Sequence, residues 1–230
     1  AISEKLKKAT VEALASTETP PIIPSRLRSA IFHVVDDVMP EEWAGAMGDW
    51  LFQQRTKMNR CGDEDGRHAY FYGIRGIDES TVDPELMGGF RKVLLSKLSD
   101  ALPEICVPDF DLTDLECNAS LFHHGHHCSW HDGVTSHDGS IATTRRVSFS
   151  YFMHSPEKMF SGGEMEFMDG SKIEPKHNQL VFWHPIQQTR ILPVECWSAH
   201  VLHGRWELHG WLHGNPPDGW VDKLTKLRDS

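Results

Sequence analysis

The second half of the chain is a series of short β-type runs. From about Leu115 onward, apolar and β-branched stretches alternate with Gly, Asp and Pro. Short strands at regular spacing with turn residues between them are typical of β-sandwiches and β-barrels. The predicted strands cover residues 118–122, 147–153, 164–168, 179–183 and 206–212. A β-sandwich or barrel is therefore the expected core.

The first half has the patterns of helices. Residues 41–54 follow Pro40, which is tolerated at a helix start, and residues 83–102 carry apolar side chains near helical spacing until Pro103. Residues 30–35 read as a strand and 55–68 as a mobile loop. Helices followed by many strands predict an α+β fold. We expect two parts, an N-terminal helix with a Pro-rich arm at 1–24 and a single domain at 25–230.

Composition narrows the class of protein. The 230 residues suffice for one sizeable core, and the net charge of −10 argues against nucleic-acid binding, which needs excess Lys and Arg. The five cysteines show no C-x-x-C spacing, which favours reduced thiols in the cytoplasm. No stretch approaches the roughly 20 apolar residues that span a bilayer. The sequence predicts a cytoplasmic protein with no membrane segment.

An ordered set of motifs lies between residues 130 and 211. It consists of Trp130-His131, Arg146, Tyr151, Gly162-Gly163-Glu164, Leu180-Val181-Phe182-Trp183, Ile191-Leu192-Pro193-Val194, Arg205 and Gly210-Trp211. This set resembles the prolyl-4-hydroxylase-like branch of the iron(II)/2-oxoglutarate oxygenases. The resemblance implies a double-stranded β-helix, or jelly roll, with the N-terminal helices packed on one sheet.

The resemblance also implies a cofactor chemistry. These enzymes hold Fe(II) with two imidazoles and one carboxylate and leave positions open for 2-oxoglutarate and oxygen. His131 matches the first metal ligand. Arg205 matches the residue that grips the distal carboxylate of 2-oxoglutarate, and Tyr151 matches a hydroxyl that assists it. The implied activity is hydroxylation or a related oxidation of a small molecule or a peptide side chain.

Three positions depart from this pattern. Gly133 stands where the metal-binding carboxylate belongs, two residues after His131 on the same strand face. Thr189 stands at the place of the distal histidine, and a threonine hydroxyl is a poor ligand for a divalent transition metal. Glu207, two residues after Arg205, would repel a bound carboxylate or pair with Arg205 itself.

Several alternatives follow from these departures. The His-x-Gly pattern is similar to that of halogenases in the family, in which a halide takes the vacated position. A degenerate protein that keeps the fold for binding is another alternative. An active metal site, with Fe(II) or another transition metal, needs further ligands. The candidates are Asp132, His137, His184, His200, His203 and the spacing His124-x-x-His127.

Overall fold

The computed structural model describes residues 30–61, 67–74, 84–135, 142–155, 157–220 and 222. The predicted N-terminal helix and arm at 1–24 lie outside these residues. Two α-helices, α2 (Glu41–Gln54) and α3 (Pro84–Glu104), accompany the strands. The first strands are β1 (Phe32–Val35), β2 (Asn59–Cys61), β3 (Arg67–Ile74), β4 (Leu112–Phe122), β5 (His127–His131) and β6 (Arg145–Met153). The later ones are β7 (Phe160–Gly162), β8 (Met165–Phe167), β9 (Lys172–Ile173), β10 (Gln179–Trp183), β11 (Thr189–Ile191), β12 (Val194–Cys196) and β13 (Arg205–Gly214).

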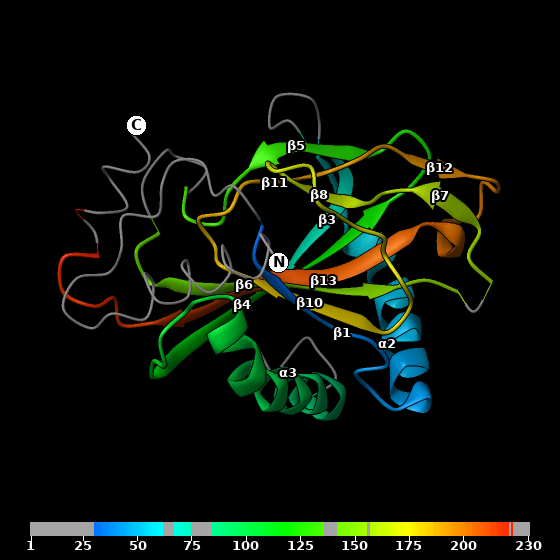
Figure 1. Cartoon of the computed structure of the whole chain (residues 1–230). Helices are drawn as coiled ribbons and strands as arrows, with labels where there is room; N and C mark the ends of the chain where they lie inside the picture. Colours follow the sequence, from blue (N-terminus) through cyan, green and yellow to red (C-terminus); the bar gives the residue numbers. More distant parts are fainter. Residues whose placement is uncertain are drawn as a thin grey trace.

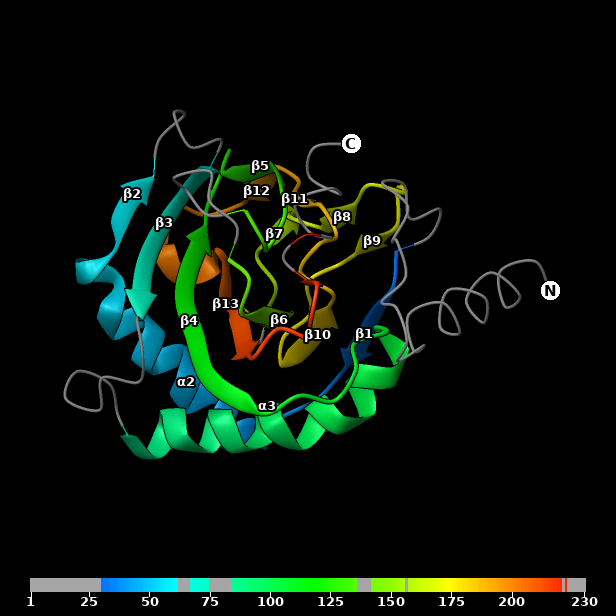
Figure 2. The same ribbon diagram turned by 90° about the vertical axis from the view of Figure 1, so that its left-hand side faces the viewer.

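The strands form two facing layers. The larger layer has the order β1-β10-β6-β13-β4-β3, and β3 continues into the second layer, β5-β11-β8-β9. The strand pairs of the described residues are antiparallel, and strands far apart in the sequence lie side by side, as β10 does between β1 and β6. The two layers are visible one above the other in Figure 1, and Figure 2 shows them edge-on. This arrangement confirms the predicted α+β jelly roll.

Both helices cover the outer face of the larger layer (Figures 1 and 2). A continuous apolar core joins them to the sheet, with Met47 and Leu51 from α2, Phe90 and Leu94 from α3, and Leu208 from β13 all fully or almost fully buried. Helix α2 has the predicted bounds, and acidic residues in its first turn suit the positive end of the helix dipole. The expected packing of helices on one sheet is confirmed.

Successive side chains along each strand point to opposite faces of the sheet, so one set joins this outer core and the other faces the space between the layers. On β13, Trp206, Leu208 and Leu212 belong to the helix-facing core. Glu207 and His209 line the space between the sheets. A side-chain period of two residues produces this division. Polar residues of β13 are thereby placed inside the jelly roll.

Two local expectations were wrong. The segment 55–68 contains β2 and the first residues of β3, which pair in the register Asn59↔Phe71, because β3 extends the larger sheet beside β4. Helix α3 continues one residue beyond Pro103, since the Ile105 N–H still donates to the Ala101 carbonyl. Among the described residues, no helix is long and apolar enough to cross a membrane.

Candidate functional site

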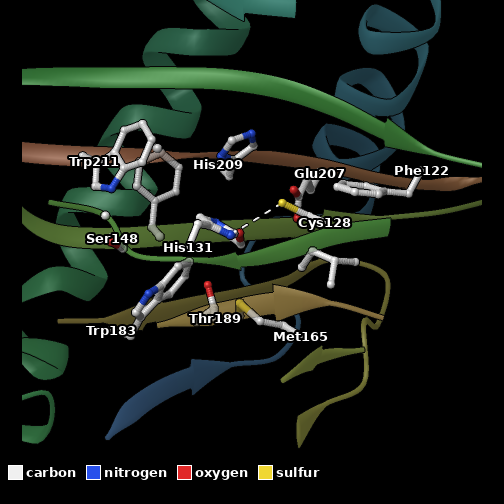
Figure 3. Close-up of a pocket in the computed structure, with 15 residues that line it drawn as sticks. Phe122, Cys128, His131, Ser148, Met165, Trp183, Thr189, Glu207, His209 and Trp211 are labelled. Carbon is white, nitrogen blue, oxygen red and sulfur yellow. Dashed lines mark hydrogen bonds between the residues drawn. The ribbon is translucent and has the colours of Figure 1, made fainter. Parts of the chain in front are cut away.

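A pocket lies between the two layers, and His131 and Thr189 are among the residues that line it (Figure 3). Its space is partly open to solvent. Its walls come from both sheets. They are formed by Phe122, Cys128, His131, Gly133, Ser148, Phe149, Ser150, Met165, Trp183, Thr189, Ile191, Glu207, His209, Gly210 and Trp211.

His131 and Cys128 share one face of β5. The register shifts between the pairs Thr189↔His131 and Ile191↔Cys128, so a bulge in β5 turns both side chains into the pocket. The Cys128 Sγ lies 3.5 Å from the His131 Nδ1, and this Nδ1 lies 2.9 Å from the Ser129 carbonyl. Because a carbonyl only accepts, Nδ1 carries the proton and Nε2 carries the lone pair. His131 therefore offers an acceptor or ligand nitrogen.

Thr189 lies directly opposite His131 on the neighbouring strand β11. Both side chains line the pocket, and Thr189 is buried. Cross-strand partners of this kind are close enough for two imidazoles to share a metal ion. The structure therefore places Thr189 where a second ligand is needed, and supplies a hydroxyl there.

The space beside Gly133 is filled. A Cβ at this position would lie 2.6 Å from the Trp211 Nε1, 2.8 Å from the Ser148 Oγ and 2.9 Å from the Pro185 Cβ. These distances are too short for any side chain without movement of the surrounding atoms. A carboxylate side chain at position 133 would therefore need Trp211, Ser148 or Pro185 to move.

Asp132 does not replace the missing carboxylate. Its Oδ1 accepts hydrogen bonds from the backbone N–H groups of Val134 and Thr135 at 3.0 and 2.6 Å, and its Oδ2 accepts one from the Thr135 hydroxyl at 3.2 Å. These contacts are those of an Asx turn at the end of β5. Asp132 is absent from the pocket walls, so the alternative of Asp132 as a ligand is contradicted. His137 lies outside the described residues.

The remaining candidate histidines lie elsewhere in the described structure. His184 is buried beside Trp220, with ring centroids 5.6 Å apart. His200 caps the short helix η3 (Val201–His203) by accepting from the Leu202 N–H, and His203 ends that helix. None of the three lines the pocket, so they do not complete a site with His131.

The residues present do not fit the iron site of the resemblance. Within the described ranges, no three His, Cys, Asp or Glu side chains gather closely enough to hold a metal ion, which also leaves His124 and His127 without such a cluster. His131 is the family ligand that stands in place. A single imidazole does not hold Fe(II) where the usual set is two imidazoles and a carboxylate.

Arg205 and Glu207 form a buried ion pair. The Arg205 Nη1 lies 2.9 Å from the Glu207 Oε2, and the two side chains are 0% and 5% exposed. Neither atom meets hydrogen-bond geometry with a described partner, so the contact is one of charge rather than a bidentate fork. Glu207 lines the pocket and Arg205 lies behind it. The structure thus contains the Arg205–Glu207 pair that the sequence analysis gave as one of two possible effects of Glu207.

Tyr151 faces away from the pocket. Its ring packs against Phe90 of α3, with centroids 5.4 Å apart, and its hydroxyl donates to the Asn178 Oδ1 at 2.9 Å. Burial, with a contribution from the charge of Glu41, raises the pKa of the Tyr151 hydroxyl. Tyr151 belongs to the core between sheet and helices, so the expectation that it assists 2-oxoglutarate is not met.

A charged cluster supports one wall of the pocket. The Arg145 guanidinium stacks 3.5 Å over the Trp211 ring, donates to the Gly133 carbonyl at 2.9 Å and pairs with Glu116 at 2.9 Å. Burial alone would raise the pKa of Glu116, but hydrogen bonds and charge from His213 and Arg145 lower it to about 2. These contacts hold the Trp211 indole in the space beside Gly133.

His184 gives the fold a pH dependence. Burial, with a contribution from the positive charge of Arg146, lowers the pKa of His184 from 6.5 to about 3. As the pH falls from about 6.5 towards 3, His184 takes up a proton in the unfolded state but not in the folded state. The free energy of unfolding therefore decreases over this range. We expect His184→Leu to flatten the urea-unfolding free energy between pH 7 and pH 4. An unchanged slope would contradict this assignment.

Sequence reasoning missed several pocket residues. Cys128 is one of them, because the register shift that turns it into the pocket depends on pairing with β11 and leaves no local pattern in the sequence. Ser148, Ser150 and His209 were likewise missed. Their signal was the alternation of polar with apolar residues in Ser148-Phe149-Ser150-Tyr151.

Comparison with known proteins supports the resemblance. Residues 117–213 match the family described as the 2OG-Fe(II) oxygenase superfamily. An uncharacterized PKHD-type hydroxylase from Synechocystis sp. (strain ATCC 27184 / PCC 6803 / Kazusa) is 22% identical over 142 residues, which are 56% of this chain. This chain spans about half of that relative, since the alignment covers 46% of its length.

Solved prolyl hydroxylases share the fold. A Pseudomonas putida prolyl-4-hydroxylase superposes with a TM-score of 0.59 at 17% identity, covering 91% of this chain and 100% of that one. A Trichoplax adhaerens prolyl hydroxylase, solved with a peptide of hypoxia inducible factor, gives 0.60 at 11% identity, covering 93% and 92%. In its matched segment and its jelly-roll fold, the chain resembles the 2OG-Fe(II) oxygenase superfamily and, within it, the prolyl-4-hydroxylase-like branch.

Proposed function

We propose that this chain binds a small molecule in the pocket between its two sheets and does not carry out iron/2-oxoglutarate chemistry. The proposal rests on what stands at positions 133 and 189, where the resemblance would place two metal ligands. The space at Gly133 is filled by Trp211 and Ser148, and Thr189 stands opposite His131. Iron retention would need ligands that these positions do not supply.

The pocket retains the features of a ligand site. Aromatic walls from Phe122, Trp183 and Trp211 are combined with the His131 imidazole and the Thr189 hydroxyl. Small-molecule sites are typically concave, mostly apolar and fitted with a few polar groups that fix orientation. Its concave, largely aromatic walls with few polar groups favour a small molecule or a single peptide side chain as ligand.

The halogenase alternative is not the one we favour. It needs a metal beside His131, and Thr189 supplies no second imidazole there. The Trp211 indole, held by the Arg145 guanidinium, also packs closely on Gly133. Chlorination is therefore not part of the proposal.

A metal-dependent oxidoreductase with a rearranged site is the second candidate. The observation in its favour is the thiol of Cys128 beside the imidazole of His131, at 3.5 Å. Thiol and imidazole together suit Zn²⁺ or Cu⁺ better than Fe(II). Stoichiometric retention of zinc or copper that is lost in Cys128→Ser would support this candidate over the first.

Turnover of 2-oxoglutarate tests the proposed function. We expect the protein, supplied anaerobically with Fe(II) and then exposed to oxygen, to release no more succinate than buffer with the same iron. A prolyl-4-hydroxylase of the same fold, assayed in parallel, verifies the reagents. Succinate release above this background that disappears in His131→Ala would overturn the proposal.

A further inference from the structure

We infer that Glu207 determines which charge a ligand of the pocket can carry. Its carboxylate pairs with Arg205 in the place that the carboxylate of a bound acid would otherwise take. The pocket therefore takes an uncharged ligand and excludes dicarboxylates. The inference deepens the proposed function and rests on it in one respect, that the pocket between the sheets is the ligand site. It does not depend on whether iron binds.

Arg205 is held as a fixed cation. Its guanidinium carbon lies 4.9 Å from the centre of the Phe122 ring and 4.8 Å from that of Phe152. A Cβ on Gly163 would lie 2.8 Å from the Arg205 Cδ, so the Gly-Gly turn packs closely on the arginine stem. With its side chain fully buried, Arg205 requires a counter-charge.

Glu207 provides this counter-charge from the pocket side. Residues two apart on a strand point the same way, and both side chains lie on the inner face of β13. The Glu207 Oε2 contacts the Arg205 Nη1 at 2.9 Å, while Glu207 also lines the pocket. Figure 3 shows the Glu207 carboxylate at the pocket wall near Cys128. A ligand therefore meets Glu207 before it reaches Arg205.

The charge balance of the walls follows from this placement. Among the described residues that line the pocket, none is Lys or Arg. Of the cations behind the walls, Arg145 pairs with Glu116 and Arg205 pairs with Glu207, so both are neutralised within the chain. A dianion would have to displace Glu207 while it gave up its own hydration, so its charge finds no net attraction. An uncharged molecule with apolar surface and hydrogen-bonding groups meets no such cost.

Replacement of Glu207 tests the inference by a gain of binding. Glutarate and its uncharged diamide, glutaramide, are titrated into the wild type and into Glu207→Ser, with EDTA present to remove metal ions. Calorimetry and thermal unfolding measure the binding. The wild type should bind glutarate more weakly than glutaramide. Glu207→Ser opens space and exposes the guanidinium, so its affinity for glutarate should rise by about tenfold or more. Its affinity for glutaramide should not change.

Two controls separate charge from space. His209→Ser enlarges the pocket from the same strand face and should show no gain for glutarate. Arg205→Gln in the Glu207→Ser background should remove the gain. If Glu207→Ser folds poorly, Glu207→Gln keeps the size of the side chain and removes its charge, and should gain affinity for glutarate with the same sign. Equal glutarate binding by wild type, Glu207→Ser and Glu207→Gln would overturn the inference, whatever the protein does with iron.

Discussion

Replacing Arg205 by alanine is expected to lower the free energy of unfolding by about 3–5 kcal/mol, because Glu207 is then left buried without its counter-charge. This loss is large against the total stability of roughly 5–15 kcal/mol for a typical domain. The substitution also removes the guanidinium that fills the space between Phe122 and Phe152. Urea unfolding at pH 7, followed by tryptophan fluorescence, measures the change.

Two comparisons show whether the pair itself is responsible. Arg205→Met combined with Glu207→Leu replaces both charges by apolar side chains of similar volume, and we expect most of the stability to return. Lys176→Ala breaks a solvent-exposed pair with Asp36 at 3.1 Å and should cost no more than about 1 kcal/mol. A double variant as unstable as Arg205→Ala would indicate that packing, rather than the unpaired charge, explains the loss.

Replacing Thr189 by histidine is expected to create a metal site that the wild type does not have. His131 and residue 189 are direct cross-strand partners whose side chains line one pocket. Two imidazoles at this spacing suit Zn²⁺ or Co²⁺, and a second ligand worth about 2.8 kcal/mol would raise the affinity roughly 100-fold. Calorimetric titration with Zn²⁺ and the visible spectrum of bound Co²⁺ measure the gain.

The matched controls use the same two positions. Thr189→Asn changes the size and polarity of the side chain without adding an imidazole, and should leave zinc affinity at the wild-type level. His131→Ala in the Thr189→His background should abolish the new site. If zinc binding survived that second change, then another residue, and not the pair across β5 and β11, would hold the metal.

The fold was largely predictable because its patterns are local. Helix α2 begins after Pro40, and its apolar positions follow one helical face, which fixes its bounds at 41 and 54. The strand at 179–183 was also found with its bounds. The segment that forms β2 and β3 was taken for a loop because its charged and glycine residues resemble a loop. Its strand character comes from pairing with β4, which is a distant part of the chain.

The site was less predictable than the fold. The alternation of Ser and aromatic residues separates the two faces of β6, but both faces are buried, so burial does not say which of them looks into the pocket, and Tyr151 was placed on the wrong one. The bulge that brings Cys128 beside His131 depends on pairing with β11. The Arg205–Glu207 pair was foreseen as an alternative because its spacing on one strand is a local property.

Anaerobic titration of the wild-type protein with Fe(II), in the presence of 2-oxoglutarate, shows whether the chain holds iron. We expect less than stoichiometric binding, with the same weak isotherm for the wild type and His131→Ala. One tightly bound Fe(II) per chain, lost in His131→Ala, would contradict this expectation.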